Sequence, residues 1–141
     1  MNINIRNIKS SDFYNYKQHI NSNISKDYFD NFISSVLNDN HHILVIEVNN
    51  QIIGSGTLLI EEKMTYGGCK MGHIENVLID DNMRGNKYGT FIVNELIKIA
   101  DNHKCYRIDL ICTEQLIPFY KNVGFDKTLA GLSFLNKHHF K

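Results

Sequence analysis

A short basic loop has the residue types of an anion-binding site, namely Arg84, Gly85, Asn86, Lys87, Tyr88 and Gly89. The loop follows a β-branched stretch at 73–79 and runs directly into a segment, 90–100, that has a broad apolar helical face. The first four amides of a helix have no intrahelical partner, and the helix dipole places about half a positive charge there. Glycines let the backbone approach a phosphate oxygen closely, and the two basic side chains add formal charge. The pattern predicts a pyrophosphate site; an ordinary β-to-α turn with two glycines is the alternative.

The composition is typical of one soluble domain spanning residues 1–141, because 141 residues with 43% hydrophobic content can bury a proper core. Fifteen basic and fifteen acidic residues give a formal net charge of zero, which argues against a nucleic-acid or membrane-surface partner. No apolar run approaches the roughly 18 residues needed to span a bilayer, and the N-terminus lacks a signal peptide. We therefore expect a cytoplasmic protein.

The cysteines and histidines do not form a metal-binding pattern. Cys69, Cys105 and Cys112 are odd in number and have no CxxC spacing, so we expect reduced, mostly buried thiols. The histidines at 41–42 and 138–139 are adjacent in sequence, which directs their side chains to opposite faces of a strand. The sequence therefore predicts no metal site.

Hydrophobic periodicity predicts alternating strands and helices. Strands are expected at 2–9, 42–48, 51–62, 73–79, 106–112 and 125–135. Helices are expected to carry Phe13, Tyr16 and Ile20, and to cover 28–37, 88–103 and 114–122. This order predicts an α/β (α+β) mixed sheet with helices on both faces, in which strands 73–79 and 106–112 are parallel neighbours. Ligands bind beyond the carboxyl ends of parallel strands, which places the 84–89 loop and Tyr120 around one cleft.

Local signals mark several turns and helix ends. Ser25 has the residue type and position of a helix N-cap, and Gly124 those of a residue that ends one. Asn49-Asn50 separates two strand patterns and predicts a tight hairpin turn. Gly54 and Gly56 lie inside a strand pattern and indicate a bulge or a close backbone neighbour.

Several linked segments resemble the GNAT superfamily of acetyl-CoA-dependent N-acetyltransferases. They are GHIENVLID (72–80), the basic loop (84–89), KCYRIDLIC (104–112) and FYKNVGF (119–125). Within that superfamily they are most similar to the glucosamine-6-phosphate N-acetyltransferases, over about residues 42–135. The resemblance implies the GNAT fold, which has a mostly antiparallel mixed sheet with one splayed parallel pair and helices on both faces.

The resemblance also implies roles for the acetyl-CoA site. The backbone of Val77, Leu78 and Ile79 would line the pantetheine arm, and the amides of Arg84–Gly89 would hold the pyrophosphate. Tyr120 matches the tyrosine that faces the departing thiolate, although a core aromatic beside Phe119 is the alternative interpretation. Glu75 matches a residue near the substrate amine, and a solvated carboxylate on an exposed strand is its alternative.

For the acceptor, the resemblance points to Lys63, Tyr66, Glu75, Asn76 and Asp109. Three positions depart from the family pattern, since Asn76 and Ile111 stand where aspartate is usual and Lys87 where glycine is usual. Asp109 could partly replace the missing carboxylate, or it could be a paired structural charge. Lys63 and Tyr66 could equally be ordinary exposed loop residues.

The chemistry of a direct transfer requires few groups. A protonated amine must lose a proton before it attacks a thioester, and a main-chain amide near Val77, where the central strand splays, is suited to the developing oxyanion. No nucleophilic cysteine or serine is required. We therefore expect acetyl-CoA to be the co-substrate and a phosphorylated amino sugar, glucosamine 6-phosphate, to be the acceptor. Another amine, a protein N-terminus, or a non-catalytic acetyl-CoA-binding module are the alternatives.

Two further expectations concern the acceptor phosphate and the assembly. An acceptor phosphate needs a second cationic subsite, for which Lys63, Lys70, Arg107, Lys137 and His138 are the candidates. The resemblance implies a homodimer that is built through the C-terminal strand. The apolar segment 130–135 supports this expectation, because such patches on small proteins tend to be interfaces.

Overall fold

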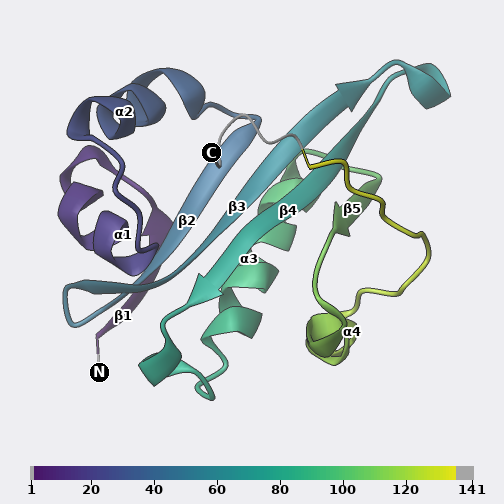
Figure 1. Cartoon of the computed structure of the whole chain (residues 1–141). Helices are drawn as coiled ribbons and strands as arrows, with labels where there is room; N and C mark the ends of the chain where they lie inside the picture. The colour runs from purple at the N-terminus through teal and green to yellow at the C-terminus, as the bar shows by residue number, and fades with distance from the viewer. Residues whose placement is uncertain (1, 136–141) are drawn as a thin grey trace. The chain divides into compact units, whose positions relative to one another are not determined.

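A five-stranded sheet organises residues up to Leu110 in this computed structural model, which describes residues 2–135 (Figure 1). Its strands lie in the order β1 (Ile3–Asn7), β2 (His41–Val48), β3 (Gln51–Lys63), β4 (Cys69–Ile79) and β5 (Arg107–Leu110). The first four strands pair antiparallel, and β5 pairs parallel to β4. The mixed sheet and its single parallel pair confirm the predicted fold class.

The chain forms two compact units, Met1–Leu110 and Ile111–Lys141, and each is described by itself. Besides the sheet, the first unit contains α1 (Phe13–His19), α2 (Lys26–Asn31) and α3 (Tyr88–Asn102), with the short helices η1 (Ser10–Asp12), η2 (Phe32–Val36), η3 (Thr65–Gly67) and η4 (Asp81–Met83). The second unit contains η5 (Glu114–Leu116) and α4 (Ile117–Val123). That both units belong to one domain stays a prediction of the sequence.

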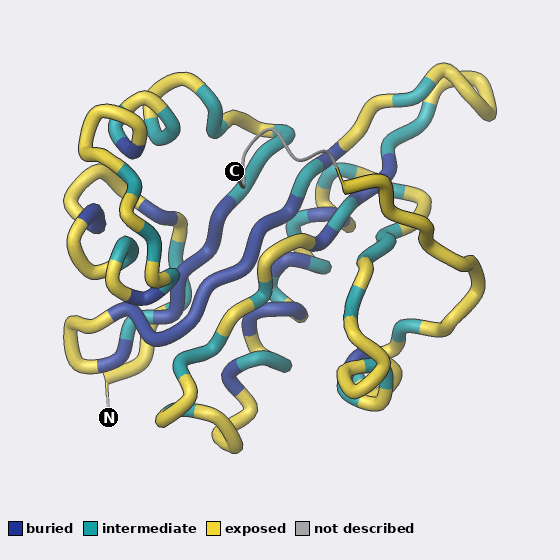
Figure 2. Tube along the Cα trace, viewed as in Figure 1, coloured by how far each residue is buried: buried dark blue, intermediate teal, exposed yellow. Residues whose placement is uncertain are grey.

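Helices cover both faces of the sheet, as predicted. On one face, Phe13 of α1 and Phe29 of α2 pack against Ile43 and Val45 of β2. On the other face lies α3, whose buried residues Tyr88, Ile92, Leu96 and Ala100 recur every four positions, with Val93 beside them. Figure 2 shows the resulting core as the dark blue segments along β2, β3 and α3.

The structure confirms the predicted helix cap, hairpin turn and helix end. The Ser25 hydroxyl accepts a hydrogen bond from the Tyr28 amide at 3.1 Å, so it caps α2. Asn49 and Asn50 have φ of 50° and 65°, which is the left-handed pair of a tight hairpin turn. The Gly124 amide bonds the carbonyl of Tyr120 at 3.1 Å at the end of α4.

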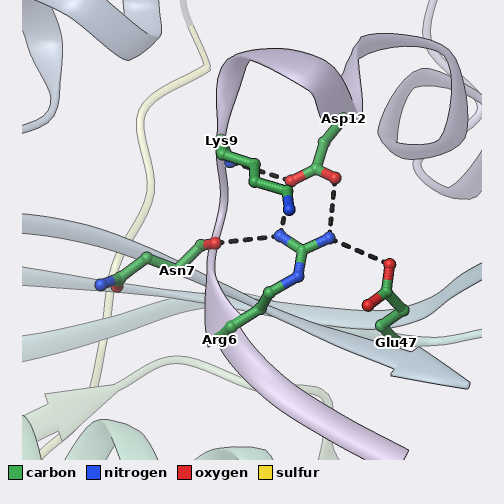
Figure 3. Close-up of polar contacts among 5 residues, drawn as sticks. All are labelled: Arg6, Asn7, Lys9, Asp12 and Glu47. Carbon is green, nitrogen blue, oxygen red and sulfur yellow. Dashed lines mark hydrogen bonds and ion pairs between the residues drawn. The ribbon is translucent and has the colours of Figure 1, made fainter. Parts of the chain in front are cut away.

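The first strand is tied to η1 by a buried ion pair (Figure 3). The Arg6 guanidinium donates two hydrogen bonds of 2.8 Å to the Asp12 carboxylate and one of 3.2 Å to Glu47. The Lys9 amide also donates to Asp12, at 2.8 Å. The Asp12 side chain is only 5% exposed. Burial opposes ionisation of Asp12, but the hydrogen bonds from Arg6 and Lys9 outweigh it and hold the pKa of that carboxyl below its ordinary 3.8.

Replacing Arg6 with Met should lower the free energy of unfolding at pH 7 by about 3–5 kcal/mol, because it leaves the Asp12 carboxylate buried without its partner. The stability contributed by the depressed Asp12 pKa is fully present above pH 3.8 and is lost as the pH falls through the lower folded value. The gap between the two proteins in urea unfolding should therefore narrow below about pH 4.

Lys26→Met is the matched control, because Lys26 pairs with Asp30 on the exposed surface of α2. It should change stability by no more than about 0.5 kcal/mol. If the difference in unfolding free energy between the wild type and Arg6→Met stayed constant from pH 7 to pH 3, the loss of stability could not be assigned to the Asp12 carboxylate.

The expected last strand at 125–135 is wrong, since the structure has no strand there. An alternating apolar pattern forms a strand only where the backbone finds a hydrogen-bonding partner. Leu129, Leu132, Phe134 and Leu135 are 68–98% exposed in the single chain. Lys137 and His138 lie outside the described residues.

The remaining expectations concern thiols and membranes. The cysteines at 69, 105 and 112 are unpaired, as predicted, but they are partly exposed rather than mostly buried. Among the helices of residues 2–135, none has the length and apolar character needed to cross a membrane.

Candidate functional site

The end of β4 is an open strand edge. β5 pairs only with Met71–Ile74, whereas β4 continues to Ile79 (Figure 1). The backbone groups of residues 75–79 that face the β5 side therefore have no strand partner in β5. Such groups can hydrogen-bond an extended ligand laid beside the strand. Val77, Leu78 and Ile79, which the resemblance assigns to the pantetheine arm, lie on this edge.

A β-bulge changes the direction of the β4 backbone at this edge. Thr57 pairs with Glu75 and Ser55 with Leu78, so Gly56 alone stands opposite two residues, Asn76 and Val77. Asn76 has φ of 52°, a left-handed conformation that asparagine tolerates better than most residues. A bulge leaves one residue out of the ladder, which makes a main-chain amide available near Val77.

Gly56 also lets α3 approach this part of the sheet. A Cβ atom at Gly56 would lie 3.0 Å from Leu96 Cδ1 of α3. A side chain at this position would therefore require Leu96 to shift by a few tenths of an ångström. The predicted bulge is confirmed, whereas the close neighbour of Gly56 is the Leu96 side chain and not a backbone segment.

The loop between β4 and α3 presents open amides. Gly85 and Lys87 have φ of 85° and 65°, so the backbone alternates into the left-handed region. Glycine is usual at position 87 in the superfamily that the sequence resembles, and the positive φ of Lys87 explains why. Within residues 2–135, the amides of Gly85, Asn86 and Lys87 donate no backbone hydrogen bond, and no side chain caps α3. The helix N-terminus is thus available to an anion.

The residues of this loop differ in what they can offer a ligand. Arg84 pairs with Asp81 at 3.0 Å, and both side chains are mostly exposed. Such a pair contributes at most about 1 kcal/mol, so a phosphate can displace the carboxylate. Tyr88 is 3% exposed, which leaves only its backbone to meet a ligand. Gly89 lies in the first turn of α3 rather than in the loop.

Glu75 is exposed on β4, immediately before the bulge and opposite Thr57. An exposed carboxylate beside an open strand edge can accept a proton from a nearby amine. The same exposure also fits a solvated surface residue, so the structure leaves both interpretations of Glu75 in place.

Two of the acceptor candidates, Tyr66 and Asp109, belong to one connected group of aromatic and charged side chains. The Tyr66 ring lies edge-on to Tyr106, with centroids 5.6 Å apart, and the Arg107 guanidinium lies 5.6 Å from the Tyr106 ring. Arg107 Nε is 3.0 Å from Asp109 Oδ1. Asp109 is therefore a paired charge, as one of the two sequence interpretations held. Lys63 lies 3.8 Å from Glu61, in a separate pair.

Tyr120 belongs to the second unit, on α4. Its ring packs edge-on against Phe119 and Phe125, at centroid distances of 4.9 and 5.8 Å. Burial, followed by the nearby Cys112, raises the pKa of the Tyr120 phenol, so the hydroxyl keeps its proton at neutral pH. The packing fits the core-aromatic interpretation and the retained proton fits that of a donor. The cleft that Tyr120 is expected to share with the loop stays a prediction.

Sequence reasoning missed two features of this region. One is the left-handed backbone at Asn76, for which asparagine within a β-branched strand was the available signal. The other is the contact between His19 of α1 and Asp80, which lies at the end of β4. The two residues are 61 positions apart, and no local pattern links them.

Comparisons with known proteins agree with this geometry. The model of the acetyltransferase (GNAT) family matches residues 3–125. The glucosamine 6-phosphate N-acetyltransferase of Trypanosoma brucei brucei is 39% identical over 75 residues, which cover 53% of this chain and 51% of that protein.

Solved structures match over nearly the whole chain. The glucosamine-6-phosphate N-acetyltransferase from Arabidopsis thaliana has a TM-score of 0.91 at 26% identity, with 96% of this chain and 99% of that chain covered. A predicted acetyltransferase from Clostridium acetobutylicum, solved with acetyl-CoA, has a TM-score of 0.71 at 26% identity, with 98% and 99% covered. The sequence matches are shorter, and span 57%, 51% and 64% of three curated relatives' own lengths.

Proposed function

Because this chain belongs to the acetyltransferase (GNAT) family, we propose that it transfers the acetyl group of acetyl-CoA to the amine of glucosamine 6-phosphate. The observation that carries the proposal is one continuous segment, in which the open edge of β4 leads into a loop at the N-terminus of α3. The amides of Gly85, Asn86 and Lys87 in this loop donate no backbone hydrogen bond within the part of the chain that the structure describes. Relatives with this acceptor in their names support the choice of substrate.

The chemistry of acetyl-CoA fits the groups on this segment. An extended pantetheine arm carries amides that can pair with the edge of Val77, Leu78 and Ile79. A pyrophosphate suits the amides of Gly85, Asn86 and Lys87 and the field of the helix N-terminus. Arg84 and Lys87 would add charge-assisted hydrogen bonds. No metal is needed for either contact.

The proposed roles in transfer concern protons and one developing charge. Acetyl-CoA supplies a thioester, whose acetyl carbon is the target of the amine. Glu75, directly or through water, accepts the proton that the ammonium must lose. A main-chain amide at the Asn76–Val77 bulge donates to the carbonyl oxygen as negative charge develops there. Tyr120 donates its proton toward the departing sulfur.

Tyr120→Phe should lower kcat by about 10²-fold, the usual scale for one positioned acid or base. The KM values for both substrates should change little, because the ring and its packing against Phe119 and Phe125 are retained. Steady-state assays of free CoA measure both constants. Phe119→Leu is the control for packing alone, and wild-type turnover in Tyr120→Phe would return Tyr120 to the role of a core aromatic.

A panel of amines assayed for free CoA tests the acceptor. We expect glucosamine 6-phosphate to be the best acceptor among amino sugars, polyamines and peptides with free N-termini. Faster release with a polyamine or a peptide would favour the alternative of the same fold acting on another amine. Binding of acetyl-CoA without release for any amine would indicate a non-catalytic module.

We also propose a homodimer. The apolar side chains of 129–135 are largely exposed in the single chain, and a second copy could cover them. Light scattering at micromolar concentration should give twice the 16.3 kDa of one chain. Replacing both Leu132 and Phe134 with Ser should then halve the measured mass, whereas a wild-type mass near one chain would contradict the proposal.

The cytoplasm is the proposed location. The three free cysteines suit a reducing compartment, in which thiols stay unpaired. An amino-sugar phosphate and acetyl-CoA are both charged small molecules, so the reaction would take place in the compartment that holds them.

A further inference from the structure

The His19 side chain is fully buried where α1 meets β3 and the end of β4. Its Nδ1 lies 2.6 Å from Asp80 Oδ1, and its Nε2 lies 2.9 Å from Ser55 Oγ. The His19 side chain is 0% exposed and the Asp80 side chain 32% exposed. An ionised carboxylate only accepts hydrogen bonds, so Nδ1 carries a proton that it donates to Asp80. Both ring nitrogens are therefore used, which fixes the orientation of the ring.

The Ser–His–Asp arrangement does not make Ser55 a nucleophile. Ser55 is 2% exposed and lies in the middle of β3, opposite Leu78 of β4. A hydroxyl buried to this degree cannot reach a substrate carbonyl. The cluster of His19, Ser55 and Asp80 must therefore act through the backbone that it holds.

That backbone leads from β4 through η4 into the 84–89 loop. The Asp80 amide donates to the Ile53 carbonyl at 2.8 Å, and the Asp80 carbonyl accepts from the Met83 amide at 2.9 Å. His19, on α1, makes the only side-chain hydrogen bond to the Asp80 carboxylate among the described residues. Asp80, the first residue after β4, is thus held from β3, from η4 and from α1.

His19 also pairs with a carboxylate that lies next to the proposed anion site. Two adjacent carboxylates, Asp80 and Asp81, precede a loop whose amides and basic side chains suit an anion. His19 binds the first at 2.6 Å, and Arg84 binds the second at 3.0 Å. When a phosphate takes Arg84 from Asp81, the His19 contact still holds Asp80 in place.

We propose that His19, supported by Ser55, is a positioning residue that fixes the β4 end of the 84–89 loop for acetyl-CoA. The inference rests on the proposed function, because it assigns acetyl-CoA to this loop. His19 touches no substrate and acts only through Asp80. Its loss should weaken acetyl-CoA binding and leave the chemical step nearly unchanged.

The test compares His19→Phe, which keeps a ring and removes both hydrogen bonds, with the wild-type chain. Calorimetry should show acetyl-CoA affinity reduced about tenfold, or about 1.4 kcal/mol. At saturating acetyl-CoA, kcat with glucosamine 6-phosphate should stay within about twofold of the wild-type value. The variant loses binding energy that the ground state and the transition state share, so the chemical step is unaffected. Hydrogen exchange should speed up at the amides of 80–89.

Asp12→Asn is the matched control for lost stability. It weakens another buried pair, between Asp12 and Arg6, in the same unit. Acetyl-CoA affinity and exchange at 80–89 should match the wild type. Equal loss of affinity in Asp12→Asn and His19→Phe would overturn the proposal, because the effect would then reflect general destabilisation.

Ser55→Ala covers the case in which His19→Phe does not fold. It removes the Nε2 contact and keeps the one to Asp80, so we expect affinity to fall by about threefold, a fraction of the effect of a full hydrogen-bond loss. Unchanged affinity in every folded variant would overturn the proposal. If the wild-type chain itself fails to bind acetyl-CoA, the proposed function fails, and faster exchange at 80–89 in His19→Phe would still separately support the anchor.

Discussion

Gly89→Asp should abolish measurable acetyl-CoA binding while the chain stays folded. Gly89 is the second residue of α3, within the first turn, where the unpaired amides and the positive end of the dipole lie. A carboxylate there competes with the pyrophosphate for the free amides, and its negative charge cancels the positive end of the helix dipole. The same carboxylate interacts favourably with the helix, so the fold should survive. Calorimetry measures the binding, and circular dichroism with thermal unfolding measures the fold.

Asn102→Asp is the matched control, because it introduces the same charge at the last residue of the same helix. Its acetyl-CoA affinity should equal that of the wild type. A folded Gly89→Asp chain with unchanged affinity would contradict the assignment of the pyrophosphate to this loop.

Glucosamine should be acetylated with a kcat/KM at least about 10²-fold below that of glucosamine 6-phosphate. A dianionic phosphate held by two cationic groups makes charge-assisted hydrogen bonds of roughly 1.5–3 kcal/mol each, and each 1.36 kcal/mol is about a factor of ten. Arg84 and Lys87 are assigned to the cofactor, so other cations must bind this phosphate. Among described residues, the candidates are Lys63, Lys70 and Arg107.

Each of these three candidates is already paired with a carboxylate. Lys63 lies 3.8 Å from Glu61, Lys70 lies 3.9 Å from Glu62, and Arg107 lies 3.0 Å from Asp109. Partly exposed pairs of this kind contribute little, so a phosphate can replace the carboxylate. Arg107→Met should therefore reduce the preference for the phosphorylated sugar, while Lys98→Met, on α3, serves as the control for losing one exposed cation.

A similar kcat/KM for glucosamine and for glucosamine 6-phosphate would show that the second cationic subsite does not exist. Asn76 and Ile111, which stand where aspartate is usual, would then indicate a different amine. The structure gives Asn76 a separate explanation, because its φ of 52° at the bulge suits asparagine.

The strands of the first unit could be predicted because their patterns are local. Alternating or β-branched runs identified β1 to β5, and the asparagine pair at 49–50 identified the hairpin turn. The same reasoning failed at 125–135, because its alternating apolar residues have no strand partner in the described chain. Hydrophobic periodicity indicates which side chains would be buried, but it does not identify the segment that buries them.

The site was predictable only where its residues are neighbours in sequence. The 84–89 loop carries its own signals, and the lysine at 87 keeps the left-handed backbone that glycine usually supplies there. The cluster of His19, Ser55 and Asp80 joins positions 36 and 61 residues apart. Those contacts depend on how α1 packs on β3, which no short motif encodes.

The most direct test of the proposed activity is the release of free CoA by the wild-type chain, with acetyl-CoA and glucosamine 6-phosphate, followed by mass spectrometry of the sugar. One thiol should be released for each N-acetylglucosamine 6-phosphate formed, and thiol should be released only when both substrates are present. Acetyl-CoA that binds in calorimetry but releases no thiol above the acceptor-free background would contradict the proposed activity.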